Sequence, residues 1–178
     1  MPGLIFQETV SPAAAANVDI PLTTAGAVAY EIIFELVGSA AGNGDNIELN
    51  VTNDAFVSVE NTGTPYKWND ARARGATPTN TVTGSESEDF IQMLTNLGTA
   101  AGEFAMGRIQ VNFPHDTGVG TNFEFKFTRI NATGELFSTF GGAFYVTAES
   151  INGFRLAFDD LTGSPTFTGT VHIFALVS

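Results

Sequence analysis

Residues 123–128 read Phe-Glu-Phe-Lys-Phe-Thr, and this stretch decides the fold class. Successive side chains of an extended strand point to opposite faces, so the three phenylalanines share one face and the polar residues between them share the other. This alternation is typical of a strand with one face in a hydrophobic core and the other in water.

The same period of two recurs in other parts of the chain. Hydrophobic side chains occupy every second position in residues 30–37, 47–52, 108–113 and 154–158. Residues 171–177 are apolar on both faces except at His172, which predicts a central strand. Turn signals rich in Gly and Asn separate the stretches, at 42–45, 61–63, 131–134, 152–153 and 161–165. Many short strands with such turns predict an all-β, antiparallel sandwich, and we expect a jelly-roll-like topology in one domain over residues 1–178.

Two regions depart from this alternation. Residues 61–89 are polar and rich in Thr, Gly and Asn, and they predict a long, mostly irregular loop. Residues 86–97 fit a short helix capped by Ser85, and they fit equally a strand with Phe90 and Ile91 inside.

The charge balance limits the classes of partner. The chain has 7 Lys and Arg residues against 19 Asp and Glu residues, a formal net charge of -12. Nucleic-acid binding requires basic side chains that neutralise phosphates, and an anionic membrane surface would repel the chain in the same way. We therefore expect neither nucleic acid nor a membrane as a partner, whereas basic protein surfaces are favoured.

Composition also bears on the core and the compartment. The 16 Phe residues, in a chain that is 43% hydrophobic, predict a core filled by aromatic rings. The absence of cysteine excludes disulfides, thiolate metal sites and a cysteine nucleophile. The N-terminal stretch has no basic segment followed by a long apolar run, and Glu31 and Glu35 interrupt the longest apolar run. We therefore expect a soluble protein made in the cytoplasm.

The sequence offers no set of catalytic residues. Its two histidines, His115 and His172, lie in a turn signal and within an apolar stretch, and no G-x-S-x-G motif supplies a nucleophile. We interpret His172 as a structural histidine that forms a hydrogen bond within the fold. The acidic residues single out no carboxylate pair for glycoside hydrolysis. We therefore expect no enzymatic activity and no cofactor.

Acidic loop residues raise the alternative of calcium binding. Calcium requires several oxygen ligands that converge from loops, and the candidate ligands are Asp45, Asp159 and Asp160. No D-x-D-x-D-G register is present, so we interpret these carboxylates as turn-capping and solvated groups and predict no metal site.

The polar 61–89 segment carries the candidate binding residues, Tyr66, Trp68, Arg72 and Arg74. Aromatic side chains beside arginines in a polar loop can stack on a sugar or anchor a protein interface. The alternative is a segment that folds back and buries Trp68 against the sandwich, and this is the interpretation that we favour.

The two ends of the chain resemble a large group of phage virion structural proteins. Residues 151–158 read INGFRLAF, and after a short loop residues 167–176 read FTGTVHIFAL. The group ends in a similar way, with a strand, a loop and an ending like F-x-x-G-x-I-x-L-Y-G-L, although Phe-Ala-Leu here replaces the usual aromatic-Gly-aliphatic ending. Similar features towards the N-terminus are QET at 7–9, VDI at 18–20 and YEIIF at 30–34. The resemblance covers these two ends, roughly half of the chain.

The resemblance implies structural roles for the last strand and a place in a phage particle. It implies that Phe167 is an inward plug, that Gly169 forms the turn into the last strand, and that Val171 and Ile173 belong to the core. The group consists largely of capsid decoration proteins, head fibres and tail proteins, and sandwiches of this sort often assemble as trimers. It thus implies a virion protein made in the bacterial host.

These expectations lead to a principal hypothesis and two alternatives. The principal hypothesis is a capsid decoration (cement) protein that forms a homotrimer and binds the major capsid protein or another virion protein. One alternative is a carbohydrate-binding module of a tail or head fibre, with a host glycan as its ligand and Tyr66 and Trp68 as its contacts. A polysaccharide-degrading enzyme is the third.

Overall fold

Strands alone form the regular structure of the described part of the chain. The computed structural model describes residues 3–39, 46–60, 63, 65–75, 80–94, 97, 103–131, 133–158 and 166–178. Its strands are β1 (Gly3–Val10), β2 (Ala13–Ala15), β3 (Asn17–Pro21), β4 (Ala27–Ser39), β5 (Ile47–Thr52), β6 (Tyr66–Arg74), β7 (Asn80–Glu88), β8 (Ile91–Leu94), β9 (Ala105–Asn112), β10 (Thr121–Ile130), β11 (Leu136–Tyr145), β12 (Gly153–Phe158) and β13 (Thr166–Val177). Within these ranges there is no helix long and apolar enough to cross a membrane.

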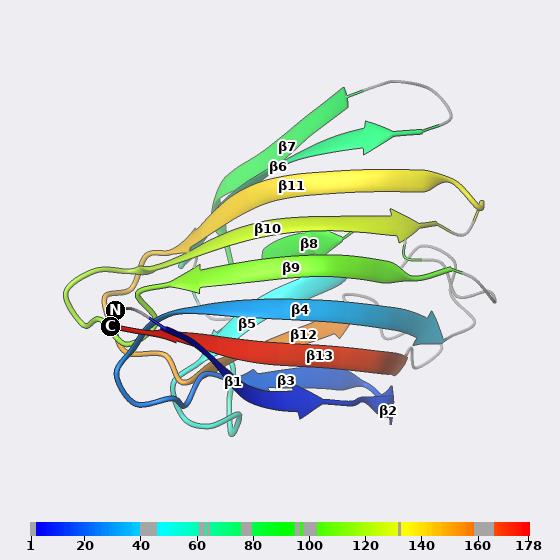
Figure 1. Ribbon diagram of the computed structural model, residues 1–178. Coiled ribbons are helices and arrows are strands. Elements are labelled where there is room, and N and C mark those ends of the chain that lie inside the picture. Colours follow the sequence, from blue (N-terminus) through cyan, green and yellow to red (C-terminus); the bar gives the residue numbers. More distant parts are fainter. Residues whose placement is uncertain are drawn as a thin grey trace.

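The strands form two antiparallel sheets that pack face to face. The larger sheet has the order β1-β13-β4-β9-β10-β11-β6-β7, with β2 paired to β13, and the smaller sheet has the order β3-β12-β5-β8. Figure 1 shows the larger sheet in front of the smaller one. The predicted all-β, antiparallel sandwich is confirmed.

The strand order is that of a jelly roll. One half of the sandwich is β1-β13-β4-β9 and the other half is β3-β12-β5-β8. When these eight strands are numbered from one to eight in chain order, one sheet has the order 1-8-3-6 and the other has the order 2-7-4-5. This is the jelly-roll arrangement. The pairs β6–β7 and β10–β11 are additions to this framework, and both extend the larger sheet beyond β9.

The prediction of a long loop over residues 61–89 is wrong. Most of this segment forms β6 and β7, which pair with each other in an antiparallel register. In Figure 1 β7 lies at the upper margin of the larger sheet, and no strand of the smaller sheet lies behind it. A strand without a covered face needs no alternating apolar side chains, so its sequence resembles that of a loop.

Residues 86–97 were compatible with a helix or a strand, and the described residues are extended. The end of β7 leads through a bend into β8, where Ile91 and Met93 are buried. β8 forms the edge of the smaller sheet beside β5.

The core lies between the sheets and consists of the side chains that the alternation predicts. Tyr30, Ile32, Phe34 and Leu36 of β4 are buried, and so are the three phenylalanines of β10. Phe158 and Phe167 stack with ring centroids 4.1 Å apart, which confirms Phe167 as an inward plug. The predicted aromatic core is therefore present.

Two residues, Phe113 and Gly169, differ from their expected positions, whereas His172 has its expected role. Phe113 does not continue the buried face of β9, because the strand ends at Asn112 and Phe113 is exposed with a φ of 59°. His172 forms the predicted hydrogen bond within the fold, because its Nδ1 lies 2.9 Å from the Thr9 hydroxyl, and it lies on the exposed face of β13. Gly169 lies inside β13, not in a turn before it.

Gly169 marks the point where the neighbour of β13 changes. Phe167 and Thr168 pair with β2, whereas β1 pairs with β13 from Val171 onward. The φ of Gly169 is 139°, and an added Cβ would collide with the Glu35 carbonyl oxygen. Only glycine fits this conformation without strain.

Candidate functional site

The four interface or ligand-binding candidates lie on one strand and on one of its faces. Tyr66, Trp68, Arg72 and Arg74 belong to β6, and alternation places them all on the inner side of the larger sheet. Tyr66 begins the strand and Arg74 ends it, so they lie at opposite ends of the row. The structure therefore aligns these residues but does not gather them around one point.

The two aromatic side chains of this row belong to the core. Tyr66 is fully buried, and its hydroxyl donates to the Glu60 carbonyl at 2.6 Å and accepts the Val51 N–H at 2.9 Å. Burial raises the pKa of the Tyr66 hydroxyl above its ordinary value. Trp68 is half-buried and packs against the core cluster. This agrees with the favoured alternative, in which the segment folds back against the sandwich.

Arg72 belongs to a group of charged side chains under β6 and β7. Its Nε donates to Oδ2 of Asp70 at 2.7 Å, and Oδ1 of Asp70 accepts the Thr83 hydroxyl at 2.5 Å. Arg129 is 1% exposed, and its guanidinium lies 4.5 Å from the centroid of the Phe137 ring. Burial, together with the nearby Arg72, lowers the pKa of Arg129 to about 10, and Asp70 opposes the shift.

Arg74 forms an ion pair with Glu135 at the far end of the row. The hydrogen bond from Arg74 is the main cause that lowers the pKa of the Glu135 carboxyl. This ion pair joins the end of β6 to the turn before β11, so its immediate role is structural.

The structure describes none of the three candidate calcium ligands. Asp45, Asp159 and Asp160 lie outside the described residues. Among the residues that the structure does describe, no group of three or more His, Asp or Glu side chains is arranged to hold a metal ion. His115 contacts the core, where its Nε2 lies 3.1 Å from the Tyr30 hydroxyl.

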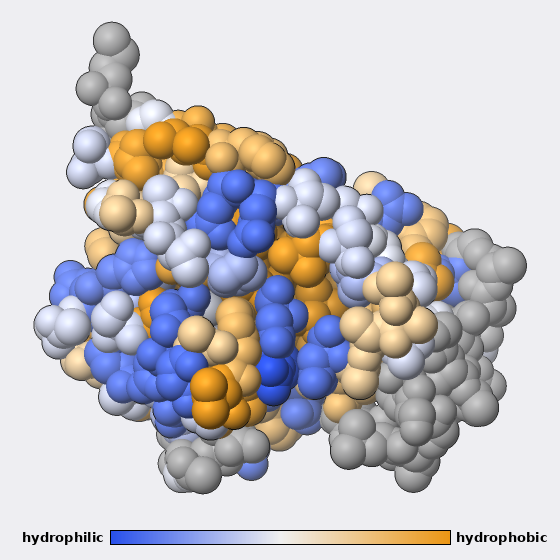
Figure 2. Space-filling model, turned by 90° about the horizontal axis from the view of Figure 1, so that it is seen from below, coloured by the Kyte–Doolittle hydropathy of each residue, from blue (hydrophilic) through white to orange (hydrophobic). Residues whose placement is uncertain are grey.

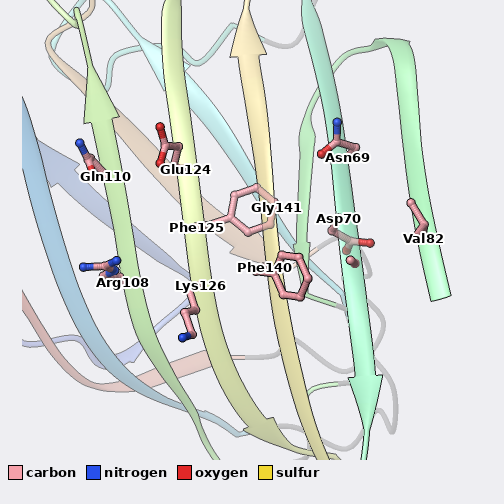
Figure 3. A pocket seen from close by; sticks show the side chains of 11 residues that line it. Asn69, Asp70, Val82, Arg108, Gln110, Glu124, Phe125, Lys126, Phe140 and Gly141 are labelled. Atoms are coloured by element: carbon pink, nitrogen blue, oxygen red, sulfur yellow. The ribbon is translucent and has the colours of Figure 1, made fainter. Parts of the chain in front are cut away.

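A hollow of about 400 Å³ opens on the outer face of the larger sheet, and we call it the outer groove. Figure 3 shows the side chains around it, which come from β9, β10, β11, β6 and β7. Gly141 of β11 contributes only backbone to its floor. The polar and aromatic side chains at its walls are Asn69, Arg108, Gln110, Glu124, Lys126 and Phe140.

A second hollow lies next to the outer groove along β11. This hollow, of about 270 Å³, shares Asn69 with the first and is lined by Lys67, Gly142 and Phe144 among others. Gly142 points outward, and a Cβ added there would meet only the Phe123 carbonyl oxygen, at 3.6 Å. Absence of a side chain at Gly142 therefore keeps the passage between the two hollows open.

Charges of both signs surround the groove. Arg108 and Lys126 are direct cross-strand partners on β9 and β10. Such like-charged pairs repel each other. Glu31 partly compensates, because its Oε1 lies 3.5 Å from Nη1 of Arg108. The exposed side chains of Asn69, Glu124 and Lys126 form no hydrogen bond with another described residue, so their polar atoms are available to a ligand.

A second surface feature lies at the opposite edge of the larger sheet. Leu4, Ile5 and Phe6 of β1 are 55%, 48% and 54% exposed, and we call them the β1 apolar strip. Leu4 and Phe6 pair with Leu176 and Phe174 on the outer face, whereas Ile5 pairs with the buried Ala175 and so lies on the other face. Figure 2 shows hydrophobic side chains gathered along the upper margin of this side of the molecule.

Neither surface feature was identified from the sequence. The residues of the outer groove are spread from position 69 to 141 and come together only through strand pairing. The Gly141-Gly142 pair inside an otherwise alternating strand was the available signal. For the β1 apolar strip the signal was Leu-Ile-Phe near the start of the chain.

Comparison with known proteins adds no relative to this description. No family model, no curated protein and no solved structure matches the chain.

Proposed function

We propose that this chain is a structural protein of a bacteriophage virion, of the capsid decoration type, which assembles as a homotrimer on the particle surface. The proposal rests on the resemblance of the two chain ends to phage virion proteins and on the β1 apolar strip. The particle partner would be the major capsid protein or another virion protein.

The β1 apolar strip is the observation that carries the self-association. Consecutive residues of a strand face opposite sides, yet Leu4, Ile5 and Phe6 are all about half exposed. The beginning of β1 is thus apolar on both faces, and its outer edge has no neighbouring strand among the described residues. A strand of this composition is typical of one that is covered on both faces. A second copy of the chain provides such a cover with the same uncharged surface.

The charge of the chain fits an assembly that uses this strip and leaves the rest of the surface solvated. A formal net charge of -12 makes copies repel each other at most orientations. The strip itself carries no charged side chain at positions 4–6, so it is the place where two copies can approach with least repulsion. Stable interfaces bury about 1,200–2,000 Å² in total, and closed symmetry is the norm.

The experiment compares Phe6→Asp with a matched control by size-exclusion chromatography and light scattering. The unchanged chain is expected at three times its mass of 18.8 kDa. Phe6→Asp should weaken association by about 100-fold or more, because it places a charge in the apolar contact. The control Val82→Asp changes a residue of β7 that is 75% exposed and should remain trimeric.

Two results would count against the proposal. A monomeric unchanged chain at high protein concentration would overturn the self-association. Mass spectrometry of purified phage particles tests the location separately, and absence of the chain from the particles would overturn the virion assignment while leaving the self-association intact.

A further inference from the structure

We propose that the outer groove, together with the second hollow along β11, binds a neutral polysaccharide chain through its pyranose rings. This inference is independent of the proposed role in assembly, because it uses a different part of the larger sheet. Among the residues that line the two hollows, only Trp68 belongs to the β6 row that the sequence singled out.

The size and shape of the groove suit an extended ligand. The two hollows have volumes of about 400 Å³ and 270 Å³ and meet at Asn69. Ligand pockets have volumes of roughly 300–1,000 Å³. Phe140 lies in one hollow and Phe144 in the other, four residues apart on one face of β11, which is about 13 Å along a strand. A ligand that contacts both rings is therefore a chain and not a single small ring.

The aromatic side chains supply stacking surfaces for such a chain. Phe140 is 59% exposed on the outer face of the larger sheet. Its ring projects at the wall of the groove in Figure 3, beside the backbone of Gly141. The C–H face of a pyranose ring is apolar, so it can pack on an exposed aromatic ring while its hydroxyl groups remain at the edge.

The polar side chains supply hydrogen bonds at that edge. Asn69 and Gln110 offer amide donors and acceptors, Glu124 offers acceptors, and Lys126 offers donors. Hydrogen bonds between charged groups and neutral hydroxyls are stronger than those between two neutral groups. Asn69 and Glu124 stand on either side of Gly142, the open position between the hollows. A chain that crosses Gly142 therefore passes between hydrogen-bonding groups on both sides.

The charges around the groove favour a neutral ligand. The charged side chains that line the two hollows are Lys67, Arg108 and Lys126 against Asp70, Glu86 and Glu124. Behind them, Glu31 pairs with Arg108 and Arg72 pairs with Asp70. The formal charges cancel locally, in contrast to the net charge of -12 of the whole chain. An acidic polysaccharide would gain nothing here and would be repelled by the rest of the molecule.

The backbone argues against a peptide as the occupant. β10, β11 and β6 each pair with a strand on both sides, so their backbone hydrogen-bonding groups are already used. A peptide that adds to a sheet requires a free strand edge, and the groove floor over β10, β11 and β6 has none. The free edge of β7 lies at the margin of the groove, to which β7 contributes only Val82. A ligand recognised by side chains alone fits the arrangement better.

The test measures binding of the full chain to immobilised neutral glucan, mannan and galactan oligosaccharides and to acidic alginate and hyaluronan oligosaccharides. At least one neutral series should bind, with an affinity that changes less than about twofold between low and high salt, because no net charge is neutralised. Binding of acidic oligosaccharides alone, or of no oligosaccharide in either group, would overturn the proposal.

Three variants locate the binding site. Phe140→Ala should weaken binding about tenfold through loss of the stacking surface. Gly142→Val should abolish it, because the new side chain fills the open passage without a backbone collision. Leu136→Ala is the matched control, since Leu136 is exposed on the same face of β11 but does not line the groove, and it should bind as the unchanged chain does.

The variants remain informative only if they fold, so the melting temperature and the β-sheet circular dichroism signal of each are measured alongside. A folded Gly142→Val chain that still binds would place the ligand elsewhere and overturn the proposal. Equal losses in Leu136→Ala and Phe140→Ala would do the same.

Discussion

The two edges of the larger sheet contrast in chemistry although both are single outer strands. β1 presents Leu4, Ile5 and Phe6 to solvent, whereas β7 reads NTVTGSESE and is mostly polar. Unpaired strand edges attract other strands, and charged residues on an edge oppose this. Glu86 and Glu88 give β7 such protection, and the first half of β1 has no charged side chain.

The contrast indicates that the two edges have different uses. An apolar edge that stayed exposed would lead to uncontrolled aggregation, so it is best explained by a specific partner. The polar β7 edge needs no partner and can remain in water. The next quantity to measure is how much each edge strand contributes to the free energy of unfolding. Three substitutions test this contribution.

The largest effect is expected at the β7 edge from Asp70→Asn. The Asp70 side chain is fully buried, receives hydrogen bonds from Arg72 and Thr83, and offsets the charges of Arg72 and Arg129. Removal of one partner from a buried ion pair leaves an uncompensated charge and costs about 3–5 kcal/mol. Urea unfolding should show this loss of stability, and hydrogen exchange should show faster exchange of the backbone amides in β6 and β7. A loss below about 1 kcal/mol would mean that β7 does not depend on the buried charges.

An intermediate effect is expected at the β1 edge from Gly169→Ala. The φ of 139° and the proximity of the Glu35 carbonyl oxygen leave no room for a side chain, and the Gly169 N–H donates to the Pro12 carbonyl at 3.3 Å. Strained backbone of this kind costs about 1–3 kcal/mol. Thermal unfolding checks the value, with Gly142→Ala as a control that should change it by less than about 0.5 kcal/mol. Equal stability of the two variants would contradict the assigned role of Gly169.

The smallest effect is expected from Lys67→Ala, at the β7 edge again. The ion pair of Lys67 with Glu86 joins β6 to β7, but both side chains are at least half exposed. Exposed pairs contribute about 0.2–1 kcal/mol, and salt screens them. Unfolding free energies at low and high salt should therefore differ little between this variant and the unchanged chain. A loss as large as that of Asp70→Asn would show that surface charges hold the edge.

The sequence predicts the covered strands better than the uncovered ones. β4, β9, β10 and β12 have one face in the core, and this produces the alternation that identifies them. β7 has no covered face, so Thr, Ser and Glu suffice there and the sequence resembles a loop. The jelly-roll order was predicted as a class. The alternation of β10 identified that strand, but no local signal showed that the β6–β7 and β10–β11 pairs widen one sheet.

The candidate sites show that the sequence does not reveal which face of a strand meets the core. The sequence singled out Tyr66 and Trp68 because they stand in a polar segment, yet strand alternation turns both toward the core. The sequence predicted an aromatic core without singling out Phe140, and the same alternation turns Phe140 toward solvent. Which face of a strand meets the core is decided by neighbouring strands, and the groove residues from β9 to β7 meet only in the folded sheet.

The pairing of β1 with β13 has a practical consequence for protein engineering. Gly3 lies opposite Val177, and Figure 1 shows the two ends of the chain next to each other. Paired residues on adjacent strands are only about 5 Å apart, so a short glycine linker can join the ends into a circular permutant. New ends can then be opened in the exposed turn around Thr133 and Gly134, between β10 and β11, at the opposite end of the sheet. Cargo displayed at that turn would leave the β1 apolar strip unobstructed, whereas cargo fused at the original ends would crowd it.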